Sequence, residues 1–310
     1  MRFRLCLGFL AMGLMVSCSS VAGGAPEDLD ETSSSGHERQ SSAVVRSSSS
    51  RSESPVQESS GSAEPSCSSA LSSDSLLSYY VSWVKIPASS VKRGSMSFSV
   101  SSFEIGKTEV TQSLYRTIMD SLPAMGVSGD SIPVANVNWY EAILFCNALS
   151  KKVGLDTAYV YEAAENAQYL QNLYVDYSVE SVRLPTEMEW EVAYRAGTTT
   201  TYYWDREEAS KYAYYVQSSG PAVVAQFMPN AYGLYDMAGN VAEWTNDWYG
   251  VKPTKSQMNY TGAKSGSLKV VRGGGWGDKV KALAADTVAK REPLYRGKDL
   301  GLRLVHSTGF

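Results

Sequence analysis

The chain has 310 residues, with 28 Lys and Arg against 32 Asp and Glu and a formal net charge of −4 at pH 7. This balance provides no basic surface of the kind that neutralises a phosphate backbone, so we expect no nucleic-acid partner. The 20 Tyr and 7 Trp lie after residue 78 and predict a domain whose core is built from large rings.

Residues 1–17 have the layout of a lipoprotein signal peptide. Arg2 and Arg4 precede an apolar run, Leu5–Val16, that is too short to span a bilayer. The residues Met15–Cys18 resemble a lipobox, in which Cys18 is the lipid acceptor, and ordinary cleavage nearby is the alternative. Lipid on Cys18 would attach the protein to a membrane. We therefore expect secretion across the cytoplasmic membrane and a lipid anchor in the cell envelope, at the outer membrane or the cell surface.

Residues 18–77 are rich in Ser, Glu, Gly and Pro and lack the apolar surface that a folded segment must bury. We interpret them as a disordered, Ser-rich tether, with a glycosylated or partner-binding stalk as the alternative. A folded domain is predicted for residues 78–310.

The first part of this domain has clear element signals. The stretches VSWVKIPA and SMSFSVSSFEIGKTEV predict short strands, because apolar, β-branched and aromatic residues alternate there with polar ones. VTQSLYRTIMDSL predicts a helix after the N-cap Thr111. A second helix is expected after Asn138 and before Gly154, and RLPTEMEWEVAYRAG predicts a third, with a capping box formed by Thr186 and Glu189.

Cys146 lies on the apolar stripe of the second predicted helix, where an unpaired thiol is usually a small buried hydrophobe. The four cysteines, at positions 6, 18, 67 and 146, have no spacing typical of a metal site or of a disulfide framework. A bond between Cys67 and Cys146 stays open as an alternative for an oxidising compartment.

The second half of the domain is rich in Tyr, Gly and Asn and has little regular periodicity. Irregular stretches of this length are usually functional or stabilised by a metal. Six blocks occur there and upstream in a fixed order: FEIGKTEVTQSLY, PVANVNWYEAILFCNALS, VRLPTEMEWEVAYRAG, PNAYGLYDMAGNVAEW, VRGGGWGD and LGLRLV. Over about residues 80 to 306 the chain thereby resembles the formylglycine-generating-enzyme (sulfatase-modifying-factor) superfamily. The resemblance implies an α+β fold, irregular and C-type-lectin-like, with short antiparallel sheets and few helices.

The catalytic members of this superfamily use a pair of cysteines to bind copper, which activates oxygen and converts a substrate cysteine into formylglycine. When the sequences are aligned on Arg272–Trp276, the two cysteine positions hold Asp278 and Leu283, so copper is not expected. The family's serine and tryptophan at two further pocket positions are Gly275 and Ala242 here.

Branches of the superfamily that hold iron use three histidines, and this chain has only His37 and His306. Asp278 as a general base in a metal-free oxidation is one interpretation, and a turn residue is the other.

The resemblance also implies a structural calcium ion at the turn LYDMAGNVAEW, because calcium prefers hard oxygen ligands. Carried over by position, Asp236, Gly239 and Val241 supply carbonyl oxygens and Glu243 its carboxylate, while Asn240 shapes the turn. Without the resemblance, this segment would be interpreted as a glycine turn followed by a surface acid. YYVQSSGPAVV lacks the asparagine and the acid of the family's second calcium site.

We therefore expect a non-catalytic binding or accessory module, with Arg272, Trp276, Asp278 and Trp244 around the former active cleft and a peptide or carbohydrate as ligand. A divergent oxidoreductase or protein-modifying enzyme that works without the cysteine pair is the rival hypothesis. A structural component of an envelope assembly is a third, supported only by the long tether.

Overall fold

A computed structural model describes residues 71–166 and 169–310. The predicted signal peptide, Cys18, Cys67 and most of the predicted tether lie outside these residues. Within the described part of the chain, no helix is both long enough and apolar enough to cross a membrane.

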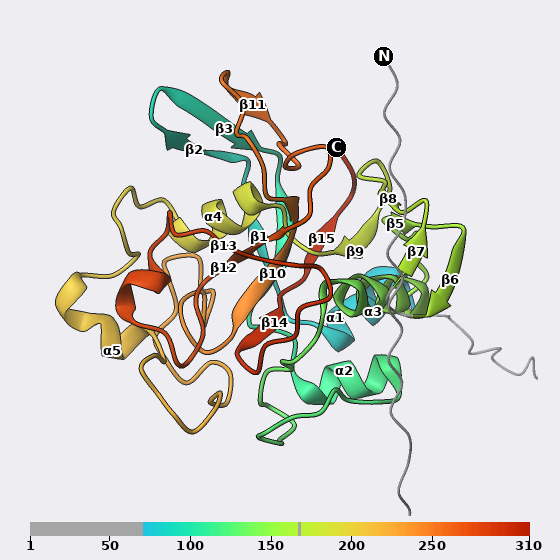
Figure 1. The fold of residues 1–310 in the computed structure, drawn as a ribbon, viewed down its shortest axis with the longest axis horizontal. Helices are drawn as coiled ribbons and strands as arrows, with labels where there is room; N and C mark the ends of the chain where they lie inside the picture. Colours follow the sequence, from blue (N-terminus) through green and yellow to red (C-terminus); the bar gives the residue numbers. More distant parts are fainter. Residues whose placement is uncertain (1–70, 167–168) are drawn as a thin grey trace, which may run out of the picture. The chain divides into compact units, whose positions relative to one another are not determined.

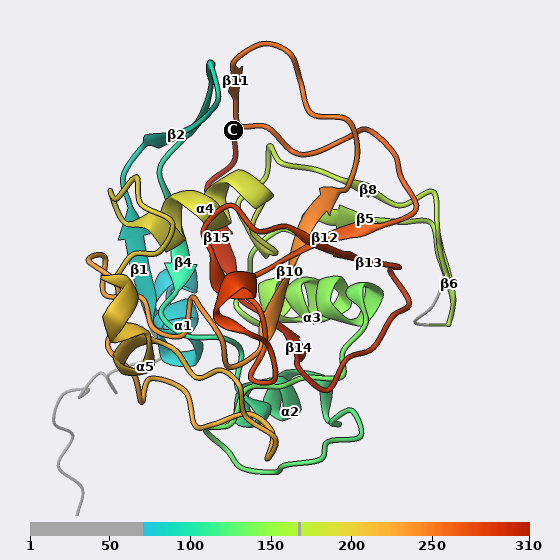
Figure 2. The ribbon, with the colours of Figure 1, turned by 60° about the vertical axis from the view of Figure 1, so that its left-hand side comes forward.

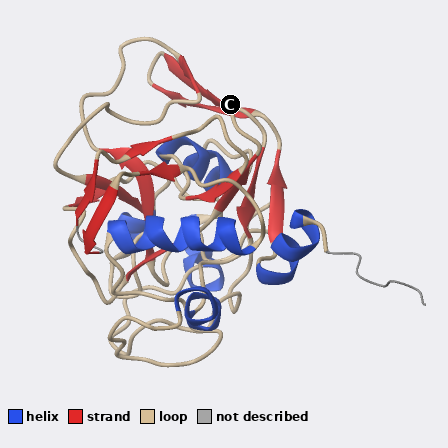
Figure 3. Ribbon diagram, turned by 90° about the vertical axis from the view of Figure 1, so that its right-hand side faces the viewer, coloured by secondary structure: helices blue, strands red, loops and turns tan. Residues whose placement is uncertain are grey.

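Short helices and strands alternate with long loops (Figure 3). The helices are α1 Ser73–Tyr80, α2 Gln112–Met119, α3 Trp139–Lys152, α4 Glu187–Arg195 and α5 Ala209–Tyr212, with short 3₁₀ turns at Arg206–Glu208 and Val280–Leu283. The strands are β1 Trp83–Ile86, β2 Ser89–Arg93, β3 Met96–Val100, β4 Phe103–Gly106, β5 Tyr159–Val160, β6 Ala163–Asn166, β7 Tyr169–Gln171, β8 Tyr174–Val175, β9 Ser181–Arg183, β10 Ala242–Trp248, β11 Gln257–Met258, β12 Lys269–Arg272, β13 Ala289–Arg291, β14 Leu300–Leu302 and β15 Val305–Ser307.

The three predicted helices begin at the predicted caps. The Thr111 hydroxyl accepts a hydrogen bond from the backbone N–H of Leu114, and Asn138 opens α3. At α4 the capping box forms as expected. The Thr186 hydroxyl accepts from the Glu189 N–H at 3.2 Å, and the Glu189 carboxylate accepts from the Thr186 N–H at 2.8 Å.

The sheets are short and mostly antiparallel, as the resemblance implied. Their strand orders are β1-β4-β15-β9, β13-β12-β10-β14 and β11-β3-β2, with two further two-stranded sheets. Two pairings, β10 with β14 and β11 with β3, are parallel. The β2–β3 hairpin and β11 extend away from the rest of the domain (Figure 1).

Strand β10 lies between the two main helices, α3 and α4, in space (Figures 1 and 2). Its side chains alternate, so that Glu243 and Asp247 face α4 whereas Trp244 and Trp248 face the segment that contains α3. Because the two faces of this one strand hold both helices, residues far apart in the sequence are brought together at β10.

Two large apolar clusters form the core. One surrounds α3 and includes Ile143, Cys146 and Leu302, and the other surrounds α4 and includes Trp190 and Ile105. Cys146 has no exposed surface, and burial raises the pKa of its thiol. The prediction that this cysteine is a buried hydrophobe is confirmed.

The folded region begins before the predicted boundary at residue 78. Helix α1 starts at Ser73, capped by the Ser72 hydroxyl, and its Leu77 is only 2% exposed in the cluster around α3. The sequence does not predict helix α1, because the segment is rich in Ser. Leu77, its one fully buried residue, comes just before the first aromatic residues of the domain.

Candidate functional site

The segment after β12 turns sharply at the predicted cleft. Gly273 and Gly274 have φ angles of 89° and 72°, which favour glycine. A Cβ at Gly275 would lie 2.7 Å from Asp299 Cβ. A serine, the residue of the catalytic family members, therefore does not fit at position 275 unless Asp299 moves.

The structure brings three of the positions singled out in the sequence to one small cavity. Arg272, Asp278 and Ala242 all line it, and its volume is about 80 Å³. Pockets for small molecules usually have roughly 300–1,000 Å³. The space that remains at the family's catalytic position is therefore small compared with the usual pocket for a small molecule.

Asp278 and Leu283, at the two cysteine positions of the catalytic family members, make structural contacts here. The Asp278 carboxylate accepts a hydrogen bond from the Gly275 N–H at 3.0 Å, which closes the turn. Leu283 has no exposed surface and belongs to the apolar cluster around α4. These contacts support the interpretation of Asp278 as a turn residue.

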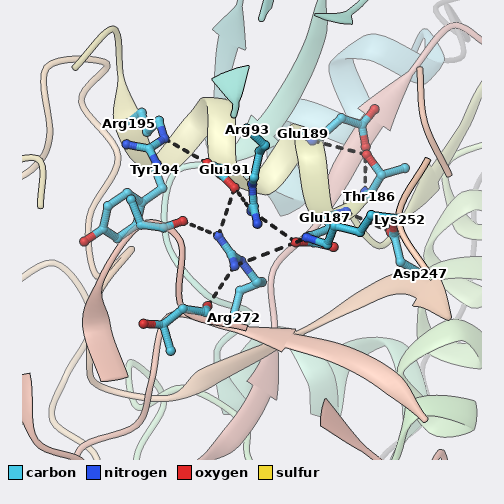
Figure 4. A network of polar contacts seen from close by, with 12 residues as sticks. Arg93, Thr186, Glu187, Glu189, Glu191, Tyr194, Arg195, Asp247, Lys252 and Arg272 are labelled. Atoms are coloured by element: carbon cyan, nitrogen blue, oxygen red, sulfur yellow. Dashed lines mark hydrogen bonds and ion pairs between the residues drawn. The ribbon is translucent and has the colours of Figure 1, made fainter. Parts of the chain in front are cut away.

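Arg272 does not offer a free cation to a ligand (Figure 4). It is 1% exposed, and its guanidinium donates to the Thr287 carbonyl at 2.7 Å, to the Ala285 carbonyl and to the Glu191 carboxylate at 3.4 Å. Glu187 and Glu191, both on α4, hold Arg272 within a buried network of ion pairs.

The same two glutamates bind cations from other segments. Arg93 at the end of β2 contacts both, and Lys252 contacts Glu187 at 3.0 Å. Burial opposes the ionisation of Glu187, but the cations of Arg272, Lys252 and Arg93 together hold the pKa of its carboxyl below the usual value. This network joins α4 to β2, to β12 and to the loop before β11.

The predicted cleft residues separate in the structure. Trp244 is fully buried and donates its indole N–H to the Val137 carbonyl, so it is a core residue. Trp276 lines a different cavity from Arg272 and Asp278. That cavity has a volume of about 260 Å³. Besides Trp276 it is lined by residues 124–127 and 218–221, Ala135, Asn136 and Lys298.

The Trp276 cavity combines an aromatic wall with a cation. The Lys298 ammonium lies 4.9 Å from the centre of the Trp276 ring, a cation–π distance. Within the described part of the chain, no carboxylate lies within ion-pair distance of Lys298. Trp276 is only 5% exposed, so a ligand here would meet the accessible edge of its ring and one exposed positive charge.

The turn predicted to hold calcium has the expected backbone shape. Asp236, Gly239 and Asn240 have φ angles of 55°, 80° and 56°, and Asn240 fulfils its predicted role in the turn. The Glu243 carboxylate is not a surface acid. It is buried and accepts hydrogen bonds from Arg303 at 2.8 Å and from the Trp190 indole at 2.6 Å.

The structure adds Glu109 to this region. Glu109 is 2% exposed, and one of its carboxylate oxygens has no hydrogen-bond partner among the residues that the structure describes. Burial and the neighbouring Asp236 raise the pKa of Glu109 well above its usual value. Three carboxyl groups, on Glu109, Asp236 and Glu243, thus share one buried guanidinium, that of Arg303.

Sequence reasoning missed both Glu109 and Arg303. Arg303 is a charged residue inside an apolar block, LGLRLV, and that placement indicates a buried ion pair. Glu109 follows Lys107 and Thr108 in FEIGKTEV, and the sequence there gives no such signal. In the described ranges, no group of three or more His, Cys, Asp or Glu side chains is arranged to hold a metal ion.

The chain matches the family model of the sulfatase-modifying factor enzyme 1-like domain over residues 84–308. It belongs to this family. The predicted superfamily is thereby confirmed.

Three similar proteins place the domain among its relatives. The chain is 30% identical over 238 residues to "Chaperone protein LppX" of Paenibacillus barcinonensis, covering 67% of this chain and 81% of that protein. It is 29% identical over 161 residues to the formylglycine-generating enzyme of Mus musculus, covering 46% of this chain and only 35% of the enzyme. The solved structure of Treponema denticola variable protein 1 has a TM-score of 0.65 and 33% identity, covering 72% of this chain and 94% of that one. The α+β fold of the sulfatase-modifying-factor type is therefore confirmed.

Proposed function

We propose that this protein is a non-catalytic accessory module of the cell envelope that binds a peptide segment of another protein beside Trp276. The observation that carries the proposal is the contrast between two cavities. The cavity at the former catalytic position has about 80 Å³, whereas the one beside Trp276 has about 260 Å³, enough for a single side chain.

A peptide ligand agrees with the chemistry of the Trp276 cavity. Aromatic residues are favoured at protein recognition sites because they bury a large area at little entropic cost. The lining residues Ser218, Ser219 and Asn136 bring polar side chains to the same cavity. The relative named as a chaperone supports a protein ligand, and the unpaired Lys298 favours a segment that carries a carboxylate.

An array of overlapping peptides from exported proteins of the same cell tests this function. We expect saturable binding of a subset of acidic peptides to the purified protein. Trp276→Ala and Lys298→Ala should each weaken this binding about tenfold or more. Lys279→Ala, which removes an exposed lysine of the same loop, is the matched control and should bind as the wild type does.

Three outcomes would contradict the proposal. Binding to a glycan array without binding to peptides would assign the ligand to carbohydrates. Equal binding by all variants would place the ligand elsewhere. Stoichiometric copper or iron in the purified protein, with oxygen consumption on cysteine peptides, would establish the rival enzyme.

Attachment to the membrane through lipid on Cys18 is part of the proposal and is supported by the signal sequence before it. In cells supplied with a labelled fatty acid, the wild-type protein should incorporate the label and fractionate with membranes. Cys18→Ser should do neither, whereas Cys67→Ser should behave as the wild type. Unlabelled wild-type protein would contradict the lipid anchor.

A structural calcium ion at the turn 236–243 is the third part. The carbonyl groups of Asp236, Gly239 and Val241 and the carboxylate of Glu243 would hold it, and Glu243 would share that carboxylate with Arg303. The support is the family resemblance and the turn itself, in which Asp236, Gly239 and Asn240 have left-handed backbone angles. A calcium content near one equivalent is expected after purification without chelators.

A further inference from the structure

A third cavity, distinct from those beside Asp278 and Trp276, lies between α1 (cyan in Figure 1) and the sheet β1-β4-β15-β9. Its volume is about 480 Å³, and the residues that give it its chemistry are Asp74, Trp83, Lys85, Glu104, Glu180 and His306. None of them lines the Trp276 cavity. We propose that this α1 cavity is a binding site for a basic residue of a peptide, an arginine or a lysine.

The inner wall of the α1 cavity is His306, which is 7% exposed. Its Nδ1 lies 3.0 Å from Glu104 Oε2 and its Nε2 lies 3.1 Å from Glu180 Oε1. Both nitrogens can donate at the same time only when the imidazole is protonated. The two glutamates thus flank one imidazole and are held facing the same space.

Each glutamate keeps one carboxylate oxygen for a ligand. Glu104 Oε1 and Glu180 Oε2 make no hydrogen bond within the described part of the chain, and the two side chains are 39% and 45% exposed. Two carboxylate oxygens facing one space form a good acceptor for a guanidinium or an ammonium group, since charge-assisted hydrogen bonds are among the strongest in proteins.

The charges of the cavity select a cation. Three carboxylates, on Asp74, Glu104 and Glu180, and one ammonium group, that of Lys85, line the cavity. Even with a charged imidazole on His306 the sum is negative. A bound cation would reduce this excess of negative charge.

Trp83 adds an aromatic ring to the wall of the cavity. Its ring lies 5.9 Å from the His306 ring, and the apolar stem of an arginine or lysine can pack on such a surface. A metal ion fits less well, because no three metal-binding side chains converge anywhere among the described residues.

Titration calorimetry of the purified full-length protein with N-acetyl-L-arginine amide tests the site. The citrulline analogue, equal in shape but uncharged, is the matched probe. We expect saturable binding of the arginine probe in the millimolar range, about tenfold weaker binding of the citrulline probe, and about tenfold weaker arginine binding by Glu104→Gln/Glu180→Gln.

Further variants separate charge recognition from loss of folding. Lys85→Gln removes a competing cation and should strengthen arginine binding severalfold, an effect that an unfolded protein would not give. Asp156→Asn removes an exposed acid outside the cavity and should have no effect, and Trp276→Ala should leave arginine binding unchanged. The inference therefore does not depend on the function proposed for the Trp276 cavity.

The proposal is overturned if the arginine probe does not saturate the protein, or if arginine and citrulline bind with equal affinity. Weakened binding in Lys85→Gln would also overturn it. Arginine binding that disappears in Trp276→Ala but persists in Glu104→Gln/Glu180→Gln would place the cation in the other cavity and would equally overturn it.

Discussion

Lys269 shows how far burial alters a single residue. Its ammonium lies 3.7 Å from the ring centres of both Trp139 and Trp248 and donates to the Asn246 carbonyl. Burial lowers the pKa of Lys269 to about 7, although the neighbouring Asp247 acts in the opposite direction. Lys269 on β12 is thus a buried residue that releases its proton near neutral pH instead of near pH 10.

The pKa of Lys269 makes stability depend on pH in a defined window. The unfolded chain keeps this lysine protonated to about pH 10.4, whereas the folded protein releases the proton above about pH 7. Between these values the unfolded state binds the extra proton. The free energy of unfolding should therefore rise with pH by up to about 1.4 kcal/mol per pH unit.

Lys269→Met should remove this contribution above pH 7, while Lys264→Met, at an exposed position, should keep it. Urea unfolding of the three proteins between pH 7 and pH 9.5 measures the difference. Parallel pH curves for wild type and Lys269→Met would show that Lys269 stays charged in the folded protein.

At the scale of elements, α4 acts as a connector. Its N-terminal half is capped by Thr186, and its acids reach Arg93 on β2, Lys252 in the loop before β11 and Arg272 on β12 (Figure 4). Buried ion pairs of this kind add little net stability, but the loss of one partner leaves an uncompensated charge. We infer that the network specifies where the β2–β3 hairpin sits.

Leu77 is the one fully buried side chain of helix α1, and Leu76 and Tyr80 pack partly buried against the same cluster. Leu77→Ala should lower the free energy of unfolding of the full chain by about 2–5 kcal/mol, because it opens a cavity in the cluster around α3. Leu71, which is 66% exposed, is the matched control, and Leu71→Ala should change stability by less than about 0.5 kcal/mol. Equal effects in denaturant unfolding would mean that α1 does not stabilise the domain.

At the scale of the whole molecule, side chains occupy most of the space at the family's catalytic position, and larger cavities lie elsewhere. Leu283 packs in the core, Asp299 occupies the space beside Gly275, and about 80 Å³ is left beside Asp278. The Trp276 cavity and the α1 cavity are larger and differ in charge. The protein thus has two separate cavities, of different charge, outside the family's catalytic position.

If calcium stabilises the domain, its removal should be visible in thermal unfolding. A chelator should lower the unfolding temperature, and added calcium should restore it, because a ligand that binds only the folded state stabilises that state. Glu243→Gln should lose the response, and Asp286→Asn, at an exposed position, should keep it. An unfolding temperature that does not respond to the chelator, in protein that contains no calcium, would contradict the site.

Local chemistry in the sequence determined the family, the caps of three helices, the first strands and the loss of the cysteine pair. These features depend on neighbouring residues, such as Thr186 with Glu189 or the order of the six blocks. Tertiary structure alone decided which candidates meet. Arg272 and Trp244 lie in the core, Trp276 lines a separate cavity, and His306 contacts Glu104 and Glu180. The reason is that β10 and β15 pair with strands distant in the sequence, and burial and charge balance arise only once those strands have met.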